Sequence, residues 1–276
     1  MQTIRPIFLL VLALAGMACG PAVAVETAWQ EVAPGAKVRL IGSGTPRPDG
    51  RLLIGIEVDM PQSTKIYWRV PGETGVPTEI DLSRSTGLAD HEALWPYPLI
   101  DKQAGLTDYA YYGHTVVPVA VTLSGDTATI EADLMMGVCS EICIPVSASF
   151  SMPLKHGEGA PGQDLRMAQA LAEVPLAWTG ATPAVSGIDY DAEAHALVIG
   201  AIAPDIDPMS IIADLGIEGQ LFGAPQKSRD TNLVVIPLLG GEGLTETAVR
   251  LTFMTDEGPF STWSDIAIGE STAANR

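Results

Sequence analysis

Residues 115–132 read TVVPVAVTLSGDTATIEA, with two apolar segments on either side of a short polar turn. In both segments apolar side chains alternate with small or polar ones, which is the period of a strand that buries one face. Ser124-Gly125-Asp126 supplies the residue types that tight turns favour, where a hairpin needs them. The stretch therefore predicts two short β-strands joined by a hairpin turn.

The same pattern extends over residues 26–155, where glycine and proline separate brief apolar segments. Residues 52–58, LLIGIEV, form one more such segment, and Pro48-Asp49-Gly50 precedes it as a turn signal. Repeated short strands separated by turns are typical of a β-sandwich. We expect a first domain of this kind over residues 25–155.

A linker with one helix is expected over residues 156–176. His156 to Gly162 is rich in glycine, Asp164 is a candidate N-cap, and Leu165 to Val174 is a strong helix former that Pro175 stops. The linker would connect the first domain to a second one over residues 177–276.

The second domain is expected to be a small β-rich unit. Its predicted strands lie at 195–199, 232–238 and 248–253, and residues 209–215 are predicted as a short helix. The predicted fold is mainly β: an immunoglobulin-like sandwich, a short helix and a second β-rich domain.

The N-terminus has the pattern of a secretory signal peptide over residues 1–24. Arg5 precedes the apolar run Ile7 to Leu14, and Ala22-Val23-Ala24 is an A-x-A cleavage site. Cys19 invites a lipoprotein interpretation, but Gly16 stands where such a signal usually has leucine, so lipid anchoring is not expected. We expect the mature protein in the periplasm.

Composition excludes several classes of function. The chain has 33 acidic and 15 basic residues, a net charge of −18, which disfavours nucleic acid and anionic lipid as partners. Beyond the signal, no apolar run approaches the ~18 residues that a membrane span needs, so we expect a soluble protein. Motifs of serine hydrolases, zinc proteases and nucleotide-binding proteins are absent from the sequence.

Cys139 and Cys143 would be the only thiols left after signal removal. In an extended strand their Cα atoms would lie about 13 Å apart, beyond the limit of about 7 Å for a disulfide. A bond between them therefore requires Ser140 to Ile142 to fold back as a tight turn, which Gly137 and Pro145 permit. Such a turn at a strand end is open to a partner.

Three uses of the pair are possible on the sequence alone. A structural disulfide that closes about five residues would contribute only about 2 kcal/mol, little for a protein of two domains. A redox pair is the second use. The third is copper(I) binding, because C-x-x-x-C followed by proline is similar to the copper loop of Sco proteins and thiolates suit Cu(I). The further ligands would be Met135, Met136 and His114.

Local charge predicts the reactivity of the reduced pair. No lysine or arginine occurs between Lys102 and Lys155, whereas Glu131, Asp133 and Glu141 do. Nearby anions and partial burial raise the pKa of a thiol. We expect a slow nucleophile, with Glu141 between the cysteines as a candidate for tuning the thiol pKa.

Three motifs together carry a family resemblance. They are LWPYP at 94–98, YAYYG at 109–113 followed by VPV at 117–119, and VCSEICIP at 138–145. In this order and spacing they resemble the exported N-terminal region of the DsbD/ScsB family of protein-disulfide reductases, closer to the ScsB branch.

The resemblance implies an immunoglobulin-like first domain and a thiol:disulfide interchange activity without a bound cofactor. Cys139 and Cys143 would accept electrons from a membrane donor of the CcdA/DsbD type. They would pass them to periplasmic thioredoxin-like or disulfide isomerase-type proteins, with Cys143 as the attacking thiolate. Other positions that match the family are candidates for capping or tuning the pair: Trp95, Tyr109, Tyr111 and Pro145. Family members continue into a membrane domain and a thioredoxin-like domain, so the membrane step is expected from a separate protein.

Overall fold

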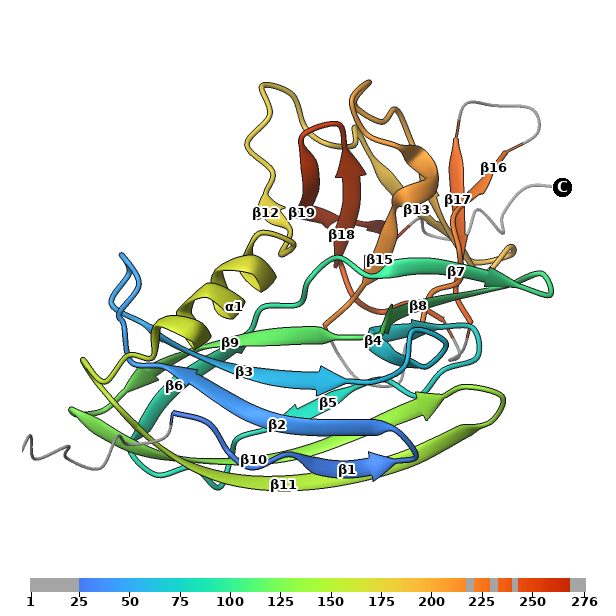
Figure 1. Cartoon of the computed structure of the whole chain (residues 1–276). Coiled ribbons are helices and arrows are strands. Elements are labelled where there is room, and N and C mark those ends of the chain that lie inside the picture. Colours follow the sequence, from blue (N-terminus) through green and yellow to red (C-terminus); the bar gives the residue numbers. More distant parts are fainter. Residues whose placement is uncertain (1–24, 217–220, 229–232, 240–242, 269–276) are drawn as a thin grey trace, which may run out of the picture.

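The computed structural model describes residues 25–216, 221–228, 233–239 and 243–268. The expected signal peptide, Cys19 and Asn232 of one predicted strand lie outside these residues. Two β-domains lie one above the other in Figure 1, with one helix beside the lower one. The prediction of a mainly β protein, with an immunoglobulin-like first domain and a second β-rich domain, is confirmed. No helix in the described part of the chain has the length and apolar character needed to span a membrane.

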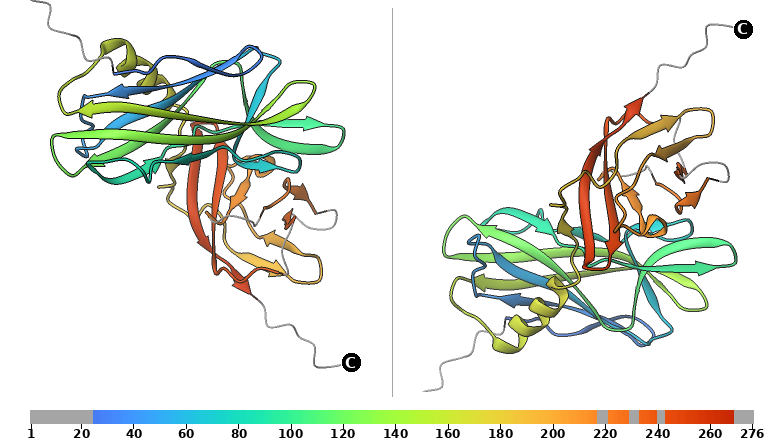
Figure 2. Two further views of the ribbon diagram at one scale, coloured as in Figure 1. Left: turned by 90° about the horizontal axis from the view of Figure 1, so that it is seen from below. Right: turned by 90° about the horizontal axis from the view of Figure 1, so that it is seen from above.

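The first domain packs two sheets face to face (Figure 2). The spatial order of the first sheet is β1 (Gln30–Ala33), β2 (Ala36–Ser43), β3 (Leu52–Asp59), β9 (Thr115–Leu123) and β6 (Leu88–Ala93). The order of the second is β11 (Cys143–Lys155), β10 (Thr127–Cys139), β4 (Lys65–Gly72), β8 (Leu106–Tyr112) and β7 (Leu99–Gln103), and β5 (Glu79–Asp81) also pairs with β10.

Strand β4 illustrates how the sequence period builds the core between these sheets. Ile66, Trp68 and Val70 are buried in the core cluster of the first domain. Since side chains alternate along a strand, Lys65, Tyr67 and Arg69 project from the opposite, outer face of the sheet. Burial of each large apolar side chain contributes roughly 1.5–3 kcal/mol, so the inward positions fix the register.

The predicted hairpin at residues 115–132 is wrong, although both of its strands exist. Strand β9 pairs with β3 and β6 in the first sheet, whereas β10 belongs to the second sheet. The turn at Ser124-Gly125-Asp126 carries the chain from one sheet to the other, and the Ser124 amide donates to the Gly87 carbonyl. The alternation of apolar residues predicts a strand with a buried face, but it does not identify the strand with which it pairs.

Helix α1 (Pro161–Leu171) covers the outer face of the first sheet. It begins earlier than predicted, because Pro161 occupies its first turn, where a missing N–H costs nothing. Asp164 is therefore not the N-cap: it lies inside the first turn and accepts hydrogen bonds from Ser43 Oγ at 2.5 Å and Thr45 Oγ1 at 3.2 Å. Met167 packs onto Gly55 of β3, where a Cβ would overlap its side chain.

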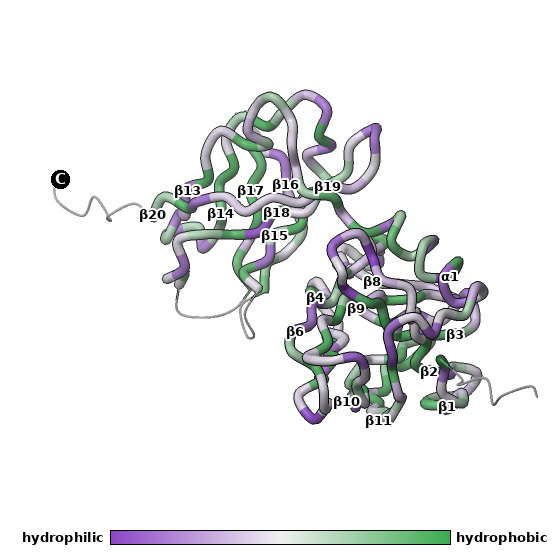
Figure 3. Tube along the Cα trace, turned by 90° about the vertical axis from the view of Figure 1, so that its left-hand side faces the viewer, coloured by the Kyte–Doolittle hydropathy of each residue, from purple (hydrophilic) through white to green (hydrophobic). Residues whose placement is uncertain are grey.

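The second domain is also built from two sheets. One contains β12 (Leu176–Ala177), β19 (Gly258–Asp265), β18 (Ala248–Thr255) and β15 (Ile212–Asp214). The other contains β16 (Gln226–Lys227), β17 (Val234–Pro237), β14 (Ala196–Ile199), β13 (Ile188–Asp191) and β20 (Ala267–Ile268). Figure 3 shows the two domains as separate bodies, with hydrophobic strand segments inside each.

The predicted helix at residues 209–215 is wrong. The chain forms one turn of 3₁₀ helix, η1 (Pro208–Ser210), and then strand β15. Ile211, Ile212 and Ala213 are all buried. A short apolar run that is buried on both faces does not distinguish strand from helix by its period.

Candidate functional site

The two cysteines close the end of a long β-hairpin. Strands β10 and β11 are each 13 residues long and pair without interruption from Thr127 opposite Lys155 to Cys139 opposite Cys143. The cysteine Cα atoms are 4.0 Å apart and a disulfide joins the sulfurs. The three residues between them fold back, with the Ser140 amide donating to the Ile142 carbonyl at 3.2 Å. The hairpin thus supplies the close approach that an extended chain does not.

The two sulfurs have different surroundings. Cys139 is 2 % exposed, whereas Cys143 lies on the exposed side of the tip. A thiolate from another protein therefore reaches Cys143 Sγ first. When the bond breaks, the buried Cys139 sulfur becomes the leaving group.

Tyr67 is the aromatic residue that touches the disulfide. Its hydroxyl lies 3.5 Å from Cys139 Sγ and 3.6 Å from Cys143 Sγ. Because disulfide sulfurs carry no proton, the hydroxyl is the donor, and its single proton is shared between the two sulfurs. The ring is 1 % exposed and packs under Gly75, where a Cβ would overlap it, while Thr78 Oγ1 donates to the Tyr67 carbonyl at 2.5 Å.

Sequence reasoning missed Tyr67 because it precedes Cys139 by 72 residues. A weak signal was present. In residues 65–70, KIYWRV, the alternation of β4 assigns Tyr67 to the face opposite Trp68, so a large aromatic side chain is directed away from the core.

A lysine also approaches the site from β4. Lys65 lies opposite Cys139 in the β10–β4 ladder, and its ammonium is 5.3 Å from the centre of the Tyr67 ring. It bonds to Asp101 Oδ2 at 2.8 Å and Asp108 Oδ2 at 2.9 Å. Burial alone would lower the pKa of Lys65, but these two carboxylates outweigh it and raise that pKa above its usual value. The sequence segment around the cysteines has no lysine or arginine, but the fold places Lys65 opposite Cys139.

The same carboxylates organise the loop that covers Tyr67. Asp108 Oδ1 accepts hydrogen bonds from the Thr74 amide at 3.1 Å and from Thr74 Oγ1 at 2.8 Å. Tyr112 donates to Asp101 at 2.5 Å. Burial would raise the pKa of Asp101, but the bonds from Lys65 and Tyr112 lower it below its usual value. The polar cluster beside the disulfide is thus charged and internally paired.

The other residues proposed for capping or tuning lie elsewhere around the hairpin. Tyr109 and Tyr111 are buried in the core cluster, and Tyr111 donates to the Pro96 carbonyl at 2.7 Å. Trp95 is half-buried and packs against the same cluster. Glu141 is exposed at the tip, and Pro145 lies opposite Gly137. Their effect on the sulfurs stays a prediction.

The residues proposed as further copper ligands are dispersed. Met136 is 1 % exposed, and Met135 faces the other side of β10. His114 Nε2 lies 2.9 Å from Glu57 Oε1 on the first sheet. No group of three or more His, Cys, Asp or Glu in the described residues is arranged to hold a metal ion.

An open groove of about 660 Å³ runs beside the hairpin tip. The tip contributes Ile142 and Ile144, whose side chains are 73 % and 42 % exposed. Its remaining lining residues are Ala33, Pro34, Ser63, Thr64, Val138, Ser140 and Glu141. Apart from Glu141 the lining is uncharged, and it mixes apolar side chains with the hydroxyls of Ser63, Thr64 and Ser140.

Comparison with known proteins identifies the first domain. Residues 43–155 match the family model described as the N-terminal domain of thiol:disulfide interchange protein DsbD. The matched segment contains both cysteines and ends with the last residue of β11. The first domain is a DsbD N-terminal domain. The resemblance found in the sequence is therefore confirmed, and this domain is of the thiol:disulfide interchange type.

The fold beyond the DsbD N-terminal domain has a solved counterpart. The crystal structure of the N-terminal periplasmic domain of ScsB from Proteus mirabilis superposes with a TM-score of 0.65 at 24% sequence identity. The match covers 89% of this chain and 100% of that chain, so both β-domains are included. No curated protein matches the sequence.

Proposed function

We propose that this protein is a periplasmic thiol-disulfide exchange protein that carries two electrons on Cys139 and Cys143. The observation that carries the proposal is a disulfide at a hairpin tip of a DsbD N-terminal domain, with one sulfur exposed and the other buried beside a hydroxyl donor. Its electrons come from a membrane donor of the CcdA/DsbD type. Its acceptors are oxidised thioredoxin-like or disulfide isomerase-type proteins of the periplasm.

Reduction of the pair follows from the exposure of Cys143. A donor thiolate attacks Cys143 Sγ, the S–S bond breaks, and its electron pair goes to Cys139 Sγ, which becomes a thiolate. The donor's second thiolate then attacks the donor sulfur of the mixed disulfide and releases Cys143 as a thiolate. The donor ends as a disulfide, and the pair ends as two thiols after proton uptake from solvent.

Oxidation of the pair uses the same atoms in reverse. The Cys143 thiolate attacks the acceptor disulfide and forms a mixed disulfide, and one acceptor sulfur leaves as a thiolate. Cys139 then attacks Cys143 Sγ, re-forms the internal disulfide and releases the second acceptor thiolate. Throughout, the Tyr67 hydroxyl is placed to donate to whichever sulfur carries negative charge, and hydrogen bonds to charged acceptors are the stronger kind.

The proposal is tested by trapping the exchange intermediate. Cys139→Ala leaves Cys143 without its resolving partner and should accumulate a mixed disulfide with an oxidised isomerase-type protein, detected by mass spectrometry. Cys143→Ala is the matched control and should trap little. In the unaltered protein, dithiothreitol should add two daltons, and the reduced form should transfer those electrons to the acceptor.

Two results would contradict this function. One is a reduced pair that transfers no electrons to any thioredoxin-like or isomerase-type disulfide. The other is a copper(I) ion retained through purification on Cys139 and Cys143, which would favour metal binding by the same sulfurs. Cell fractionation tests the location, because the proposal requires the protein in the periplasmic fraction.

A further inference from the structure

The second domain is joined to the redox domain by a buried ionic contact. Arg69 Nε of β4 donates to Asp214 Oδ2 of β15 at 2.8 Å, and Arg250 Nη2 of β18 donates to the same oxygen at 2.5 Å. Asp214 is 7 % exposed. Tyr97 adds a second link, with its hydroxyl donating to the Ser210 carbonyl at 2.7 Å. Ile212, between these points, packs within the core cluster of the first domain.

The contact reaches the strand that also carries the redox site. Lys65, Tyr67 and Arg69 alternate with the buried positions of β4 and so project from one face of it. Four residues of strand span about 13 Å, so the interdomain ion pair lies about that far along β4 from the position of Lys65 opposite Cys139. Tyr67, whose hydroxyl reaches both sulfurs, lies midway.

Strand β4 has few regular ladder contacts with its own sheet around Arg69, where the second domain contacts it. Its ladder with β8 is regular from Lys65 to Tyr67, shifts in register, and resumes at Gly72 opposite Asp108. Its ladder with β10 covers only Lys65 and Ile66. Arg69 falls within the irregular segment, where its guanidinium lies 3.8 Å from the centre of the Trp68 ring and bonds to Asp214.

Electrostatics make this link persistent. Burial would raise the pKa of Asp214, but Arg69 and Arg250 outweigh burial and keep that pKa below its usual value, so the carboxylate stays charged at neutral pH. Removing one member of a buried ionic group leaves the others without compensation, which is strongly unfavourable. The segment of β4 around Arg69 is thus held by a charged group that belongs to the second domain.

We propose that the second domain is a brace for the redox site, in which Asp214 acts through Arg69 to hold β4 so that the Tyr67 hydroxyl stays within hydrogen-bond distance of both sulfurs. Asp214 is a positioning residue, and the inference rests on the proposed exchange function. A reduced Cys139 can both donate its S–H to the Tyr67 hydroxyl and accept the O–H, and its thiolate accepts a stronger hydrogen bond still, whereas a disulfide sulfur only accepts. The brace therefore favours the reduced form. Loosening it should shift the pair toward the disulfide.

The test is a double-mutant cycle read out by redox equilibrium with glutathione, on the whole chain. Tyr67→Phe should shift the equilibrium toward the disulfide by up to about tenfold, the size expected for the net loss of one hydrogen bond. Asp214→Asn should shift it in the same direction by about threefold or more. The double variant should match Tyr67→Phe alone, because both changes remove the same hydrogen bond.

Matched controls separate positioning from general loss of stability. Glu158→Gln removes a surface ion pair with Lys155 at the end of the β10–β11 hairpin opposite the disulfide and should leave the equilibrium unchanged. Asp214→Glu restores the charge and should recover most of the shift. If Asp214→Asn does not fold, Arg69→Lys keeps the charge with a less directional donor and enters the same cycle.

An unchanged equilibrium in Asp214→Asn would overturn the brace, as would shifts of Asp214→Asn and Tyr67→Phe that simply add in the double variant. Failure of the exchange function itself looks different. In that case the unaltered protein equilibrates with glutathione but passes no electrons to a protein disulfide.

Discussion

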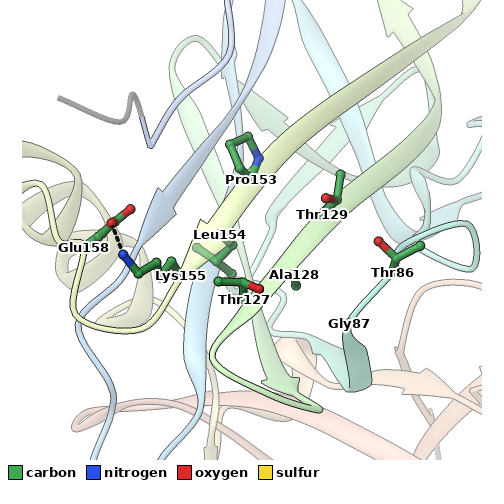
Figure 4. A pocket seen from close by; sticks show the side chains of 9 residues that line it. All are labelled: Thr86, Gly87, Thr127, Ala128, Thr129, Pro153, Leu154, Lys155 and Glu158. Carbon is green, nitrogen blue, oxygen red and sulfur yellow. Dashed lines mark hydrogen bonds and ion pairs between the residues drawn. The ribbon is translucent and has the colours of Figure 1, made fainter. Parts of the chain in front are cut away.

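The two ends of the β10–β11 hairpin have similar backbones but different surroundings. At the end formed by Thr127 and Lys155 there is an open pocket of about 480 Å³, lined by three threonines, by apolar residues and by the ion pair of Lys155 and Glu158 (Figure 4). At the other end, the buried Tyr67 hydroxyl contacts both sulfurs, and the largely buried cluster of Lys65, Asp101 and Asp108 lies beside the Tyr67 ring. A hollow surface is therefore not what distinguishes the reactive end. The distinction lies in polar groups that the fold holds in place around the sulfurs.

The largest expected contrast concerns the lysine at each end. Lys65→Met leaves Asp101 and Asp108 largely buried without their cation, and we expect it to lower the free energy of unfolding by about 3 kcal/mol. Lys155→Met removes the exposed partner of Glu158 and should leave the free energy of unfolding nearly unchanged, because solvent screens an exposed ion pair. Urea unfolding of both variants measures the difference. Equal losses would mean that the cluster beside the disulfide has no special energetic role.

A second prediction concerns the two cysteines of the reduced protein. Cys143 is exposed and Cys139 is buried, so iodoacetamide should alkylate Cys143 about tenfold faster or more. Peptide mass mapping over a time course gives both rates, and repeating it across pH tests whether the pair is the slow nucleophile that the local acidic sequence predicts. Equal rates at the two sulfurs would remove the asymmetry on which the order of attack depends.

A smaller effect is expected from the apolar rim of the tip. Ile142→Asp places a charge beside the exposed sulfur and should slow exchange with a protein disulfide about threefold to tenfold, while reduction by dithiothreitol keeps its rate. Thr86→Asp, at the pocket of the opposite end, is the matched control and should alter neither rate. Slowing of both reactions by Ile142→Asp would point to a damaged hairpin instead of a lost docking contact.

The smallest effect concerns pH. The pKa of Asp101 is lowered in the folded state, so its contribution to stability is complete above the unfolded pKa near 3.8 and is lost as pH falls through the folded value. Asp101→Asn should therefore flatten the decline of stability below about pH 4. Thermal unfolding across pH 2.5 to 6 checks this (about the range over which a carboxylate near 3.8 titrates). If the stability of the variant declines below about pH 4 as steeply as that of the unaltered protein, Asp101 does not contribute to this decline.

Much of the fold could be predicted from the sequence because it depends on local period. The strands at 52–58, 115–121 and 128–132 all exist. The segment at 128–132 buries alternate residues, whereas β3 and β9 are buried on both faces because helix α1 covers the outer face of their sheet. The tight turn at Ser140 to Ile142 followed from distance alone, because two sulfurs four positions apart cannot otherwise bond.

The errors and omissions share one physical cause. The periodicity of apolar residues in a segment gives no information on which distant strand the segment pairs with. The turn at 124–126 connects two sheets, and the buried run at 211–213 is a strand, because pairing with distant segments decided both. The β10–β4 ladder brings the Tyr67 hydroxyl to the disulfide and places Lys65 opposite Cys139, and no local pattern encodes this long-range register. The ion pair between Arg69 and Asp214 joins positions 145 residues apart and was invisible for the same reason.

The uninterrupted pairing of β10 with β11 has a further consequence for how the molecule cycles. Thirteen residues on each side are already aligned before the sulfurs meet, and only three residues lie beyond them. Opening the S–S bond therefore frees very little chain, and both oxidation states can keep one backbone. In the proposed exchange reaction, the hairpin would therefore need little structural reorganisation between its oxidised and reduced states.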